Sequence, residues 1–301
     1  MAGVAGFPRS NLAAPAGVPR LRGPTLIADM HNTETSISST TSSPALFRMQ
    51  DVSKRFPNGT LALQGMSLEC GDHEFISFLG PSGCGKSTAL RLIAGLSKIS
   101  SGTLEWPNRQ AAATGGRELS FVFQEPTLMP WTSVFNNIWL PLKLSGVSRD
   151  AAAPAIQKVL DMVGLARFAD VYPRELSGGM KMRVSIARAL VTQPRMLLMD
   201  EPFAALDEMT RLKLNNDLLA IWREHRFLVI FVTHSVYESV YLSNRVVVMA
   251  ARPGRVIEEF QIDEPYPRSE EFRTSSRYNQ HCIAVQRTLY SALDGDESAD
   301  H

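Results

Sequence analysis

The sequence predicts an α/β fold, with a parallel sheet, an antiparallel β subdomain and an inserted α-helical subdomain. Three observations predict it. The stretch Gly80–Thr88 reads GPSGCGKST and stands between an apolar run and a helical pattern. Short apolar runs recur at 196–199 and 227–232, as in strands that are buried on both faces. Residues of about 126–178 show helical spacing and separate these runs from the strands before them.

Length, charge and cysteine content set the class of protein. A chain of 301 residues can bury a sizeable core in one large domain or two small ones. The chain has 31 Lys and Arg against 30 Asp and Glu, a net charge of +1. This charge produces no strong positive potential that would attract nucleic acid, so we expect no nucleic-acid partner. The longest apolar runs, such as Phe227–Val232, are far shorter than the ~20 residues that span a bilayer, so we expect a soluble chain. Cys70, Cys84 and Cys282 are widely spaced, which argues against a disulfide framework or zinc site and favours a reducing cytoplasm.

Residues 1–44 differ from the rest of the chain. They are rich in Ala, Gly, Pro, Ser and Thr and carry no periodic apolar pattern, so we expect a disordered tail. Arg9, Arg20 and Arg22 are not followed by an uninterrupted apolar stretch, which argues against a secretory signal. Met30 is a second candidate for the start of the protein.

Two alternating apolar runs open the ordered part of the chain. Leu46–Val52 and Leu61–Leu68 are separated by the turn sequence Phe56–Gly59, which predicts paired antiparallel strands. Phe56 has two interpretations at this point. Its ring either covers the sheet or forms a platform on which a purine stacks.

The segment Gly80–Thr88 matches the phosphate-binding pattern G-x-x-x-x-G-K-[ST] after the predicted strand Phe75–Leu79. Glycines allow backbone N–H groups to turn inward around phosphate oxygens, and the helix start adds its positive dipole end. Lys86 would reach the β and γ phosphates, and Ser87 would place its hydroxyl on Mg²⁺. The residues that we expect to bind the nucleotide here are Gly80, Pro81, Ser82, Gly83, Cys84, Gly85, Lys86, Ser87 and Thr88. The apolar face of the following helix is predicted at Ala89, Leu90, Ile93 and Leu96.

The middle of the chain changes from strands to helices. Gly102–Leu104 and Leu119–Phe123 read as further strands, and the second ends at Gln124. Between about 126 and 178, helical spacing predicts an all-helical insertion, which is too long to be a plain loop. Its apolar positions are Trp131, Phe135, Ile138, Trp139 and Leu142, followed by a second helix at Ala155–Val163.

A capped helix and two strand ends carry the remaining candidate residues. Ser177 is a good N-cap, and Gly178 and Gly179 beside it leave backbone N–H groups uncovered, as in an anion site, although a simple capped helix has the same pattern. The strand Met196–Met199 ends in Asp200 and Glu201, a carboxylate pair suited to metal binding and water activation. His234 follows the strand at 227–232, a position where a histidine is more often structural than catalytic.

The end of the chain is predicted to be a hairpin and a helix. Val246–Met249 and Val256–Phe260 flank the turn Arg252–Arg255, which indicates a closing hairpin. Residues 270–293 read as an amphipathic helical tail. This tail is too short for a separate ligand-sensing domain.

Taken together in their order, these motifs resemble those of ABC transporter ATPase subunits. GPSGCGKST, Gln124, LSGGM at Leu176–Met180, LLMDEP, AALD at Ala204–Asp207 and His234 look like the Walker A, Q-loop, signature, Walker B, D-loop and H-loop. The match covers about 46–262, and within the family MDEPFAALDEMTR and FVTHSVYESVYLSNRVVVMAARPG look most like the nitrate, sulfonate and taurine importer group. Met180 and Met182 stand where the family often has Gln, and Phe56 stands where it often has Tyr.

The resemblance implies a RecA-like phosphate-loop NTPase core over residues 45–262, with the helical subdomain at about 126–178 and a helical tail at 263–301. It also implies a homodimer that binds ATP and Mg²⁺ between copies, with the signature residues Ser177, Gly178 and Gly179 facing the partner's phosphate loop. The implied catalytic residues are Glu201, His234 and Lys86, and the metal site is formed by Ser87, Gln124 and Asp200. Phe56 would stack on adenine.

The function implied is that of the ATP-hydrolysing subunit of an importer for a small anionic solute of the sulfonate, taurine or nitrate type. Such a subunit is peripheral on the cytoplasmic face of the inner membrane, with permease subunits and, indirectly, a periplasmic solute-binding protein as partners. A thiamine pyrimidine precursor as the solute, or an exporter ATPase, are the alternatives. A groove beside the insertion would accept a permease helix, and Trp131, Phe135 and Trp139 either face that partner or fill the core. DNA-repair and translation ABC ATPases would need a coiled-coil or zinc-bearing insertion or a second cassette, which this chain lacks.

Overall fold

A computed structural model describes residues 45–106 and 119–297 of the chain. The tail predicted at 1–44 lies outside these residues. The predicted boundaries of the core, insertion and C-terminal tail stay predictions.

A three-stranded antiparallel sheet has the order β2-β1-β4. Its strands are β1 (Ala45–Arg55), β2 (Leu61–Gly71) and β4 (Ser101–Glu105). The predicted antiparallel pairing of the first two strands is confirmed, and Met49 of β1 lies opposite Leu68 of β2. Alternate residues on one face, including Phe47, Met49 and Met66, are fully buried, as the period of two predicts.

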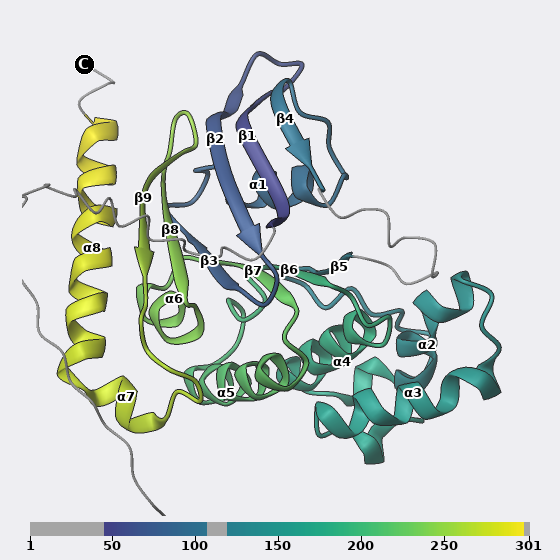
Figure 1. Ribbon diagram of the computed structural model, residues 1–301. Coiled ribbons are helices and arrows are strands. Elements are labelled where there is room, and N and C mark those ends of the chain that lie inside the picture. Colours follow the sequence, from purple (N-terminus) through teal and green to yellow (C-terminus); the bar gives the residue numbers. More distant parts are fainter. Residues whose placement is uncertain (1–44, 107–118, 298–301) are drawn as a thin grey trace, which may run out of the picture. The chain divides into compact units, whose positions relative to one another are not determined.

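The second sheet has six strands in the order β5-β6-β7-β3-β8-β9 (Figure 1). Its members are β5 (Leu119–Val122), β6 (Met196–Asp200), β7 (Leu228–Thr233), β3 (Phe75–Leu79), β8 (Arg245–Ala250) and β9 (Arg255–Gln261). All neighbours are parallel except β8 and β9, which form the predicted closing hairpin. The carboxyl ends of β3, β5, β6 and β7 therefore meet at one edge of the sheet, where α/β proteins bind ligands.

The helices begin where the sequence supplies caps. They are α1 (Lys86–Ile93), α2 (Val134–Leu144), α3 (Arg149–Met162), α4 (Gly178–Leu190), α5 (Glu208–His225), α6 (Val236–Leu242), α7 (Glu270–Thr274) and α8 (Ser276–Glu297). The side chains of Ser133, Ser148, Ser177, Asp207 and Ser235 each accept a backbone N–H in the first turn of the helix that follows. No helix within 45–106 or 119–297 is long and apolar enough to cross a membrane.

The end of α1 corrects one prediction. Leu96 was expected on the apolar face of this helix, but α1 ends at Ile93 and Leu96 is 64% exposed. Gly95 adopts a φ of 69°, and the N–H of Leu96 bonds back to the carbonyl of Arg91. A glycine in the left-handed conformation closes the helix here, as in a Schellman motif.

Helices α2 and α3 pack together and against α4, so helices are observed where the sequence predicts them between about 126 and 178. Phe135 and Trp139 pack against the core, and the indole Nε1 of Trp139 donates to the carbonyl of Val147. Trp131 was expected within a helix, but it precedes α2 and is 76% exposed. Core packing therefore accounts for two of these three aromatic residues.

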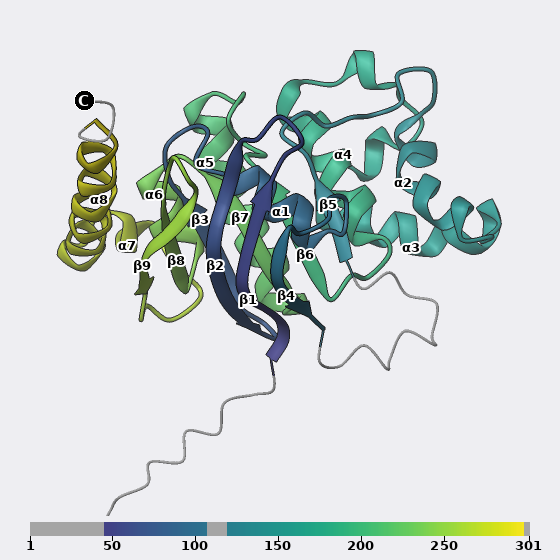
Figure 2. The same ribbon diagram turned by 90° about the horizontal axis from the view of Figure 1, so that it is seen from above.

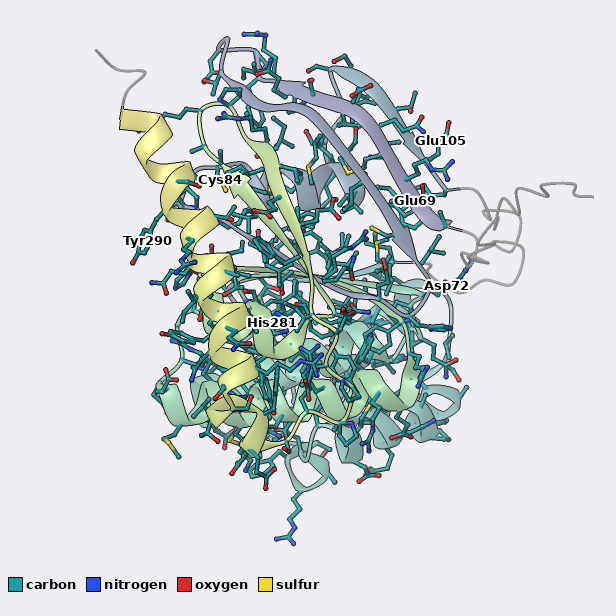
Figure 3. The ribbon with its side chains drawn as sticks, turned by 60° about the vertical axis from the view of Figure 1, so that its left-hand side comes forward. Glu69, Asp72, Cys84, Glu105, His281 and Tyr290 are labelled. Atoms are coloured by element: carbon teal, nitrogen blue, oxygen red, sulfur yellow. The ribbon has the colours of Figure 1, made fainter. Side chains whose placement is uncertain are left out.

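The C-terminal helices cover the far edge of the six-stranded sheet. Helix α8 packs on β8 and β9, while α2 and α3 lie at the opposite end of the sheet (Figure 2). Tyr278, Cys282 and Val285 form the buried face of α8. Tyr290 points away from the strands (Figure 3). The predicted amphipathic helix is confirmed, with a break at Ser275 that separates α7 from α8.

Candidate functional site

A pocket of about 600 Å³ lies where the turn after β1, the loop after β3 and the ends of β5 and β6 meet. This volume is in the range of small-molecule sites, ~300–1,000 Å³. The residues that line it are Phe56, Thr60, Leu61, Ala62, Ser82, Gly83, Gly85, Lys86, Ser87, Thr88, Gln124, Glu201, Arg252 and Gly254. Nine of the predicted site residues are in this set, and they come from four segments that are far apart in the sequence.

The phosphate loop connects β3 to α1 in a conformation that requires glycine at Gly85. Its φ is 90°, and a Cβ there would lie 2.7 Å from the carbonyl oxygen of Ala62. The ammonium of Lys86 lies under the loop and donates to the carbonyls of Gly80 and Pro81 at 2.8 and 2.9 Å. Cys84 is fully buried beneath the loop, so its side chain does not line the pocket. The loop presents backbone and a single ammonium group to the pocket, as a phosphate site does.

Ser87 lines the pocket and is hydrogen-bonded to Asp200, which lies behind it and is not part of the pocket lining. The Ser87 hydroxyl donates to Oδ1 of Asp200 at 2.8 Å, across 113 residues of sequence. Burial raises the pKa of the Asp200 carboxyl above its ordinary value, and the hydrogen bond from Ser87 opposes that shift. A cation at this position would favour the charged carboxylate.

The donor set fits Mg²⁺ that is shared with a ligand. Mg²⁺ is usually held by one or two carboxylates together with substrate phosphates and water, and Ser87 and Asp200 supply hard oxygen atoms next to the phosphate loop. Among the described residues there is no cluster of three or more His, Cys, Asp or Glu that could hold a metal without such help. The predicted Gln124 lines the same pocket.

Glu201 and His234 meet at the carboxyl ends of β6 and β7. His234 Nδ1 lies 3.3 Å from Oε2 of Glu201, and Glu201 lines the pocket. The backbone of Glu201 has a φ of 46°, which is uncommon for a non-glycine residue. Its N–H bonds to the carbonyl of Val232 in β7, which holds this conformation in place. The carboxylate is thereby directed from the strand end into the pocket.

Phe56 lies at the rim of the pocket, where the N–H of Phe56 and the carbonyl of Thr60 close the turn between β1 and β2. The side chain is exposed, and Nζ of Lys54 lies 5.2 Å from the ring centroid. The ring is therefore not enclosed by the core and is open to solvent at the pocket rim, as a platform for a purine requires.

Sequence reasoning missed the contribution of the β8–β9 turn. Arg252 and Gly254 line the pocket, and the N–H of Gly254 bonds to the carbonyl of Ala62 in β2. A Cβ on Gly254 would overlap the carbonyl oxygen of Cys84 in the phosphate loop and lie 2.7 Å from that of Ala62, so only glycine allows the turn to approach the loop. The turn itself was predicted, but no local signal places it against the loop.

Ser177, Gly178 and Gly179 do not line this pocket. Ser177 caps α4 through a bond from the N–H of Met180, and Ser177 and Gly178 are exposed. Gly179 is buried, and a Cβ there would lie 2.6 Å from Cγ2 of Thr210 in α5. Close packing of α4 on α5 therefore explains this glycine, while the helix start at Ser177 stays open to solvent.

Comparisons with known proteins agree with this geometry. A family model described as ABC transporter matches residues 63–204. An uncharacterized ABC transporter ATP-binding protein of Methanocaldococcus jannaschii is 47% identical over 73% of this chain and 81% of its own. The taurine import ATP-binding protein TauB of Rhizobium johnstonii is 44% identical over 69% of this chain and 79% of its own. The nitrate import ATP-binding protein NrtD of Synechocystis is 42% identical over 68% of this chain and 77% of its own.

Two solved structures share the fold. One is cbiO1 from Clostridium perfringens, with a TM-score of 0.66 and 26% identity over 76% of this chain and 94% of its own. The other is a dimeric ATP-binding cassette in a post-hydrolysis state with ADP and Pi, with a TM-score of 0.63 and 30% identity over 73% of this chain and all of its own.

Proposed function

The chain belongs to the family of ABC transporter ATP-binding subunits, and we propose that it powers an importer for a small anionic solute of the sulfonate, taurine or nitrate type. It is an ATPase, as members of this family are. The observation that carries the proposal is its identity of 42–44% to import subunits named for taurine, aliphatic sulfonates and nitrate. The solute passes through a separate permease, to which the chain binds at the cytoplasmic face of the membrane. A periplasmic binding protein delivers the solute.

In this proposal two copies pair so that each ATP lies between the pocket of one and the start of α4 in the other. Ser177 and Gly178 are exposed and absent from the pocket of their own chain, which supports a site that needs a second copy. The N–H groups and dipole at the α4 start would then lie on the γ-phosphate, where charge must be stabilised. The likeness to a dimeric cassette with ADP and Pi supports the same arrangement.

Each predicted residue has a role in that site. Phe56 stacks on the adenine, while the phosphate loop and Lys86 bind the phosphates. Ser87, Asp200 and Gln124 would hold Mg²⁺, which supplies charge neutralisation when it is bound. Glu201 orients or deprotonates the attacking water, and His234, 3.3 Å away, contacts the γ-phosphate.

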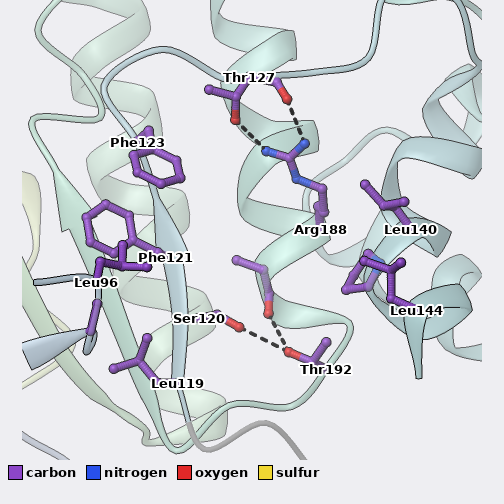
Figure 4. Close-up of a pocket in the computed structure, with 13 residues that line it drawn as sticks. Leu96, Leu119, Ser120, Phe121, Phe123, Thr127, Leu140, Leu144, Arg188 and Thr192 are labelled. Carbon is purple, nitrogen blue, oxygen red and sulfur yellow. Dashed lines mark hydrogen bonds between the residues drawn. The ribbon is translucent and has the colours of Figure 1, made fainter. Parts of the chain in front are cut away.

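A second cavity, of about 400 Å³, is the proposed binding site for part of the permease (Figure 4). It is an apolar groove between α2, α4 and β5, lined by Ala94, Leu96, Leu119, Ser120, Phe121, Phe123, Thr127, Leu140, Pro141, Leu144, Arg188, Ala189 and Thr192. The side chain of Arg188 lines the groove and donates hydrogen bonds to the carbonyls of Pro126 and Thr127. We assign it to a short helix of the permease, because Leu96, Phe123 and Leu144 expose apolar surface there.

The groove and the nucleotide pocket share one short segment. Phe123 lines the groove and its neighbour Gln124 lines the pocket. Phe123 stacks on Phe121 with ring centroids 4.4 Å apart, which ties this segment to β5. A shift of Gln124 on nucleotide binding would therefore move a wall of the groove, and this is the proposed route by which ATP hydrolysis drives the permease.

Replacing Leu144 with glutamate is expected to uncouple the permease from the ATPase. Leu144 is 70% exposed, so the change should alter folding stability by no more than ~0.5 kcal/mol. A charge facing an apolar helix would cost roughly 2 kcal/mol of binding, and permease-stimulated ATPase activity should fall by more than about tenfold. The ATPase activity of the isolated chain should not change. Full stimulation in this variant, and in Leu96→Glu, would exclude the groove as the docking site.

The proposed function is tested with the permease in proteoliposomes. ATPase activity is measured with candidate binding proteins loaded with a sulfonate, nitrate or a thiamine pyrimidine precursor. We expect stimulation by the sulfonate or nitrate protein. Stimulation only by the binding protein for the pyrimidine precursor would show that the solute is of that class and not a sulfonate or nitrate. An ATPase that requires Lys86 and Glu201 but responds to no binding protein would reject the import function and favour export.

A further inference from the structure

Beyond the residues above, a buried polar network joins the turn that carries His234 to the loop Ala204–Asp207. We propose that Glu238 and Arg211 are positioning residues, which link these two segments and set the alignment of His234 with Glu201. This inference rests on the proposed roles of His234 and Glu201. Neither Glu238 nor Arg211 lines the nucleotide pocket.

One end of the link is the His234 turn. Thr233 precedes His234 at the end of β7, and its hydroxyl donates to Oε2 of Glu238 at 2.7 Å. The same hydroxyl oxygen accepts the N–H of Ser235 at 3.0 Å, so both neighbours of His234 are held by one oxygen atom. In an ordinary capping box, Glu238 would accept the N–H of Ser235 directly. Here the hydroxyl of Thr233 is interposed, and the carboxylate of Glu238 orients it.

The other end of the link is the loop before α5. Nη2 of Arg211 donates to the carbonyl of Leu206 at 2.9 Å. The side chain of Leu206 lies next to the exposed Gly178, where a Cβ on the glycine would be 3.5 Å from Cδ2 of the leucine. Arg211 is therefore bonded to the loop that borders the start of α4. The start of α4 is the part of the chain proposed to contact the second copy.

The two ends approach each other without closing. Nε of Arg211 is 4.0 Å from Oε1 of Glu238, and within the described residues neither atom has a hydrogen-bond partner. A hydrogen bond forms at ~2.9 Å, so a movement of about 1 Å would close the gap. Burial raises the pKa of the Glu238 carboxyl, while the nearby Arg211 opposes that shift, so a closer approach of the two groups would favour the charged carboxylate. We infer that this contact closes when ATP brings the second copy against Gly178 and Leu206.

Substitution of either residue is expected to lower turnover without weakening nucleotide binding. In Glu238→Gln the amide oxygen can keep the bond from Thr233, but its NH₂ group then faces the N–H of Arg211, and two donors meet without an acceptor. Arg211→Gln removes the contact from the other side, and Arg211→Lys keeps the charge but cannot contact both partners at once. Loss of one buried charged hydrogen bond corresponds to a fall in kcat of about tenfold for each variant, with KM for ATP unchanged.

The kcat of the double variant Arg211→Gln/Glu238→Gln shows whether the two residues act through each other or independently. If the residues act through each other, the double variant loses no more than about tenfold, whereas independent effects multiply to about a hundredfold. A hundredfold loss would overturn the proposal, and so would a kcat within about twofold of wild type for Glu238→Gln, or losses that appear in KM instead of kcat.

Glu74→Gln is the matched control. Its carboxylate pairs with the half-buried Arg245 at 2.9 Å, but it precedes β3 at the edge of the sheet opposite the phosphate loop. It should reduce thermal stability as Glu238→Gln does while kcat stays at the wild-type level. An equal loss of kcat in Glu74→Gln would mean general loosening and would overturn the link. Glu201→Gln is measured in parallel: if it retains turnover the proposed function's base is wrong, whereas an inactive Glu201→Gln beside a fully active Glu238→Gln rejects the link alone.

Discussion

Replacing Glu201 with glutamine is expected to lower kcat by about 10²–10⁴-fold, the contribution of a positioned general base. Glutamine has nearly the same shape, so contact with His234 at 3.3 Å can persist, but the amide cannot accept a proton from water. The backbone of Glu201 is held by the bond of its N–H to Val232, which the substitution does not touch. ATP binding and pairing of the two copies should therefore remain intact.

Three measurements check this expectation: steady-state hydrolysis, ATP affinity by equilibrium binding, and size by chromatography with and without ATP. The variant should accumulate as an ATP-bound dimer, because closure no longer leads to hydrolysis. Glu224→Gln is the control, since this carboxylate at the end of α5 is 72% exposed and should not affect turnover. Hydrolysis near the wild-type rate in Glu201→Gln would show that another group activates the water.

A mixture of two inactive variants is expected to recover activity if each site is built from two copies. Gly178→Asp places a carboxylate at the exposed start of α4, where it would repel the γ-phosphate and remove an anion site, at a cost of ~10²–10³-fold in kcat. Lys86→Ala removes the ammonium from the phosphate loop. Each homodimer then has two defective sites.

In a mixed dimer both defects fall in one site, and the other combines an intact loop with an intact α4 start. Half of randomly formed dimers are mixed and each has one working site of two, so an equal mixture should show about a quarter of wild-type activity. The control is each variant at the same total concentration alone. No gain above the sum of the two variants would exclude a site shared between copies and would favour complete sites within single chains.

Several features of the fold and site could be predicted because their signals are local. A glycine-rich loop before a helix, and strands that end in Asp200 and Glu201, depend on residues that are adjacent in sequence. The order of these motifs was sufficient to identify the family resemblance and hence the roles expected of Gln124 and His234. The parallel sheet then brought the strand ends together, since such ends share one edge.

The predictions that were wrong concern the ends of helices, where the apolar periodicity continues beyond the residue at which the helix starts or stops. Leu96 continues the apolar spacing of α1, but Gly95 takes a left-handed conformation and ends the helix first. Trp131 fits the spacing of α2, but that helix begins after the cap at Ser133. Periodicity marks which residues are apolar and does not fix where a helix starts or ends.

The sequence by itself determined the nucleotide chemistry of this protein: the phosphate loop, the carboxylates, the capped helix at Ser177 and the ATPase family that they indicate. Only the tertiary structure placed Gly254 against Ala62 and left a 4.0 Å gap between Arg211 and Glu238. It also assembled the groove from α2, α4 and β5. The reason is that a motif acts through neighbours along the chain, whereas these contacts join residues that come together only when the sheets and helices pack.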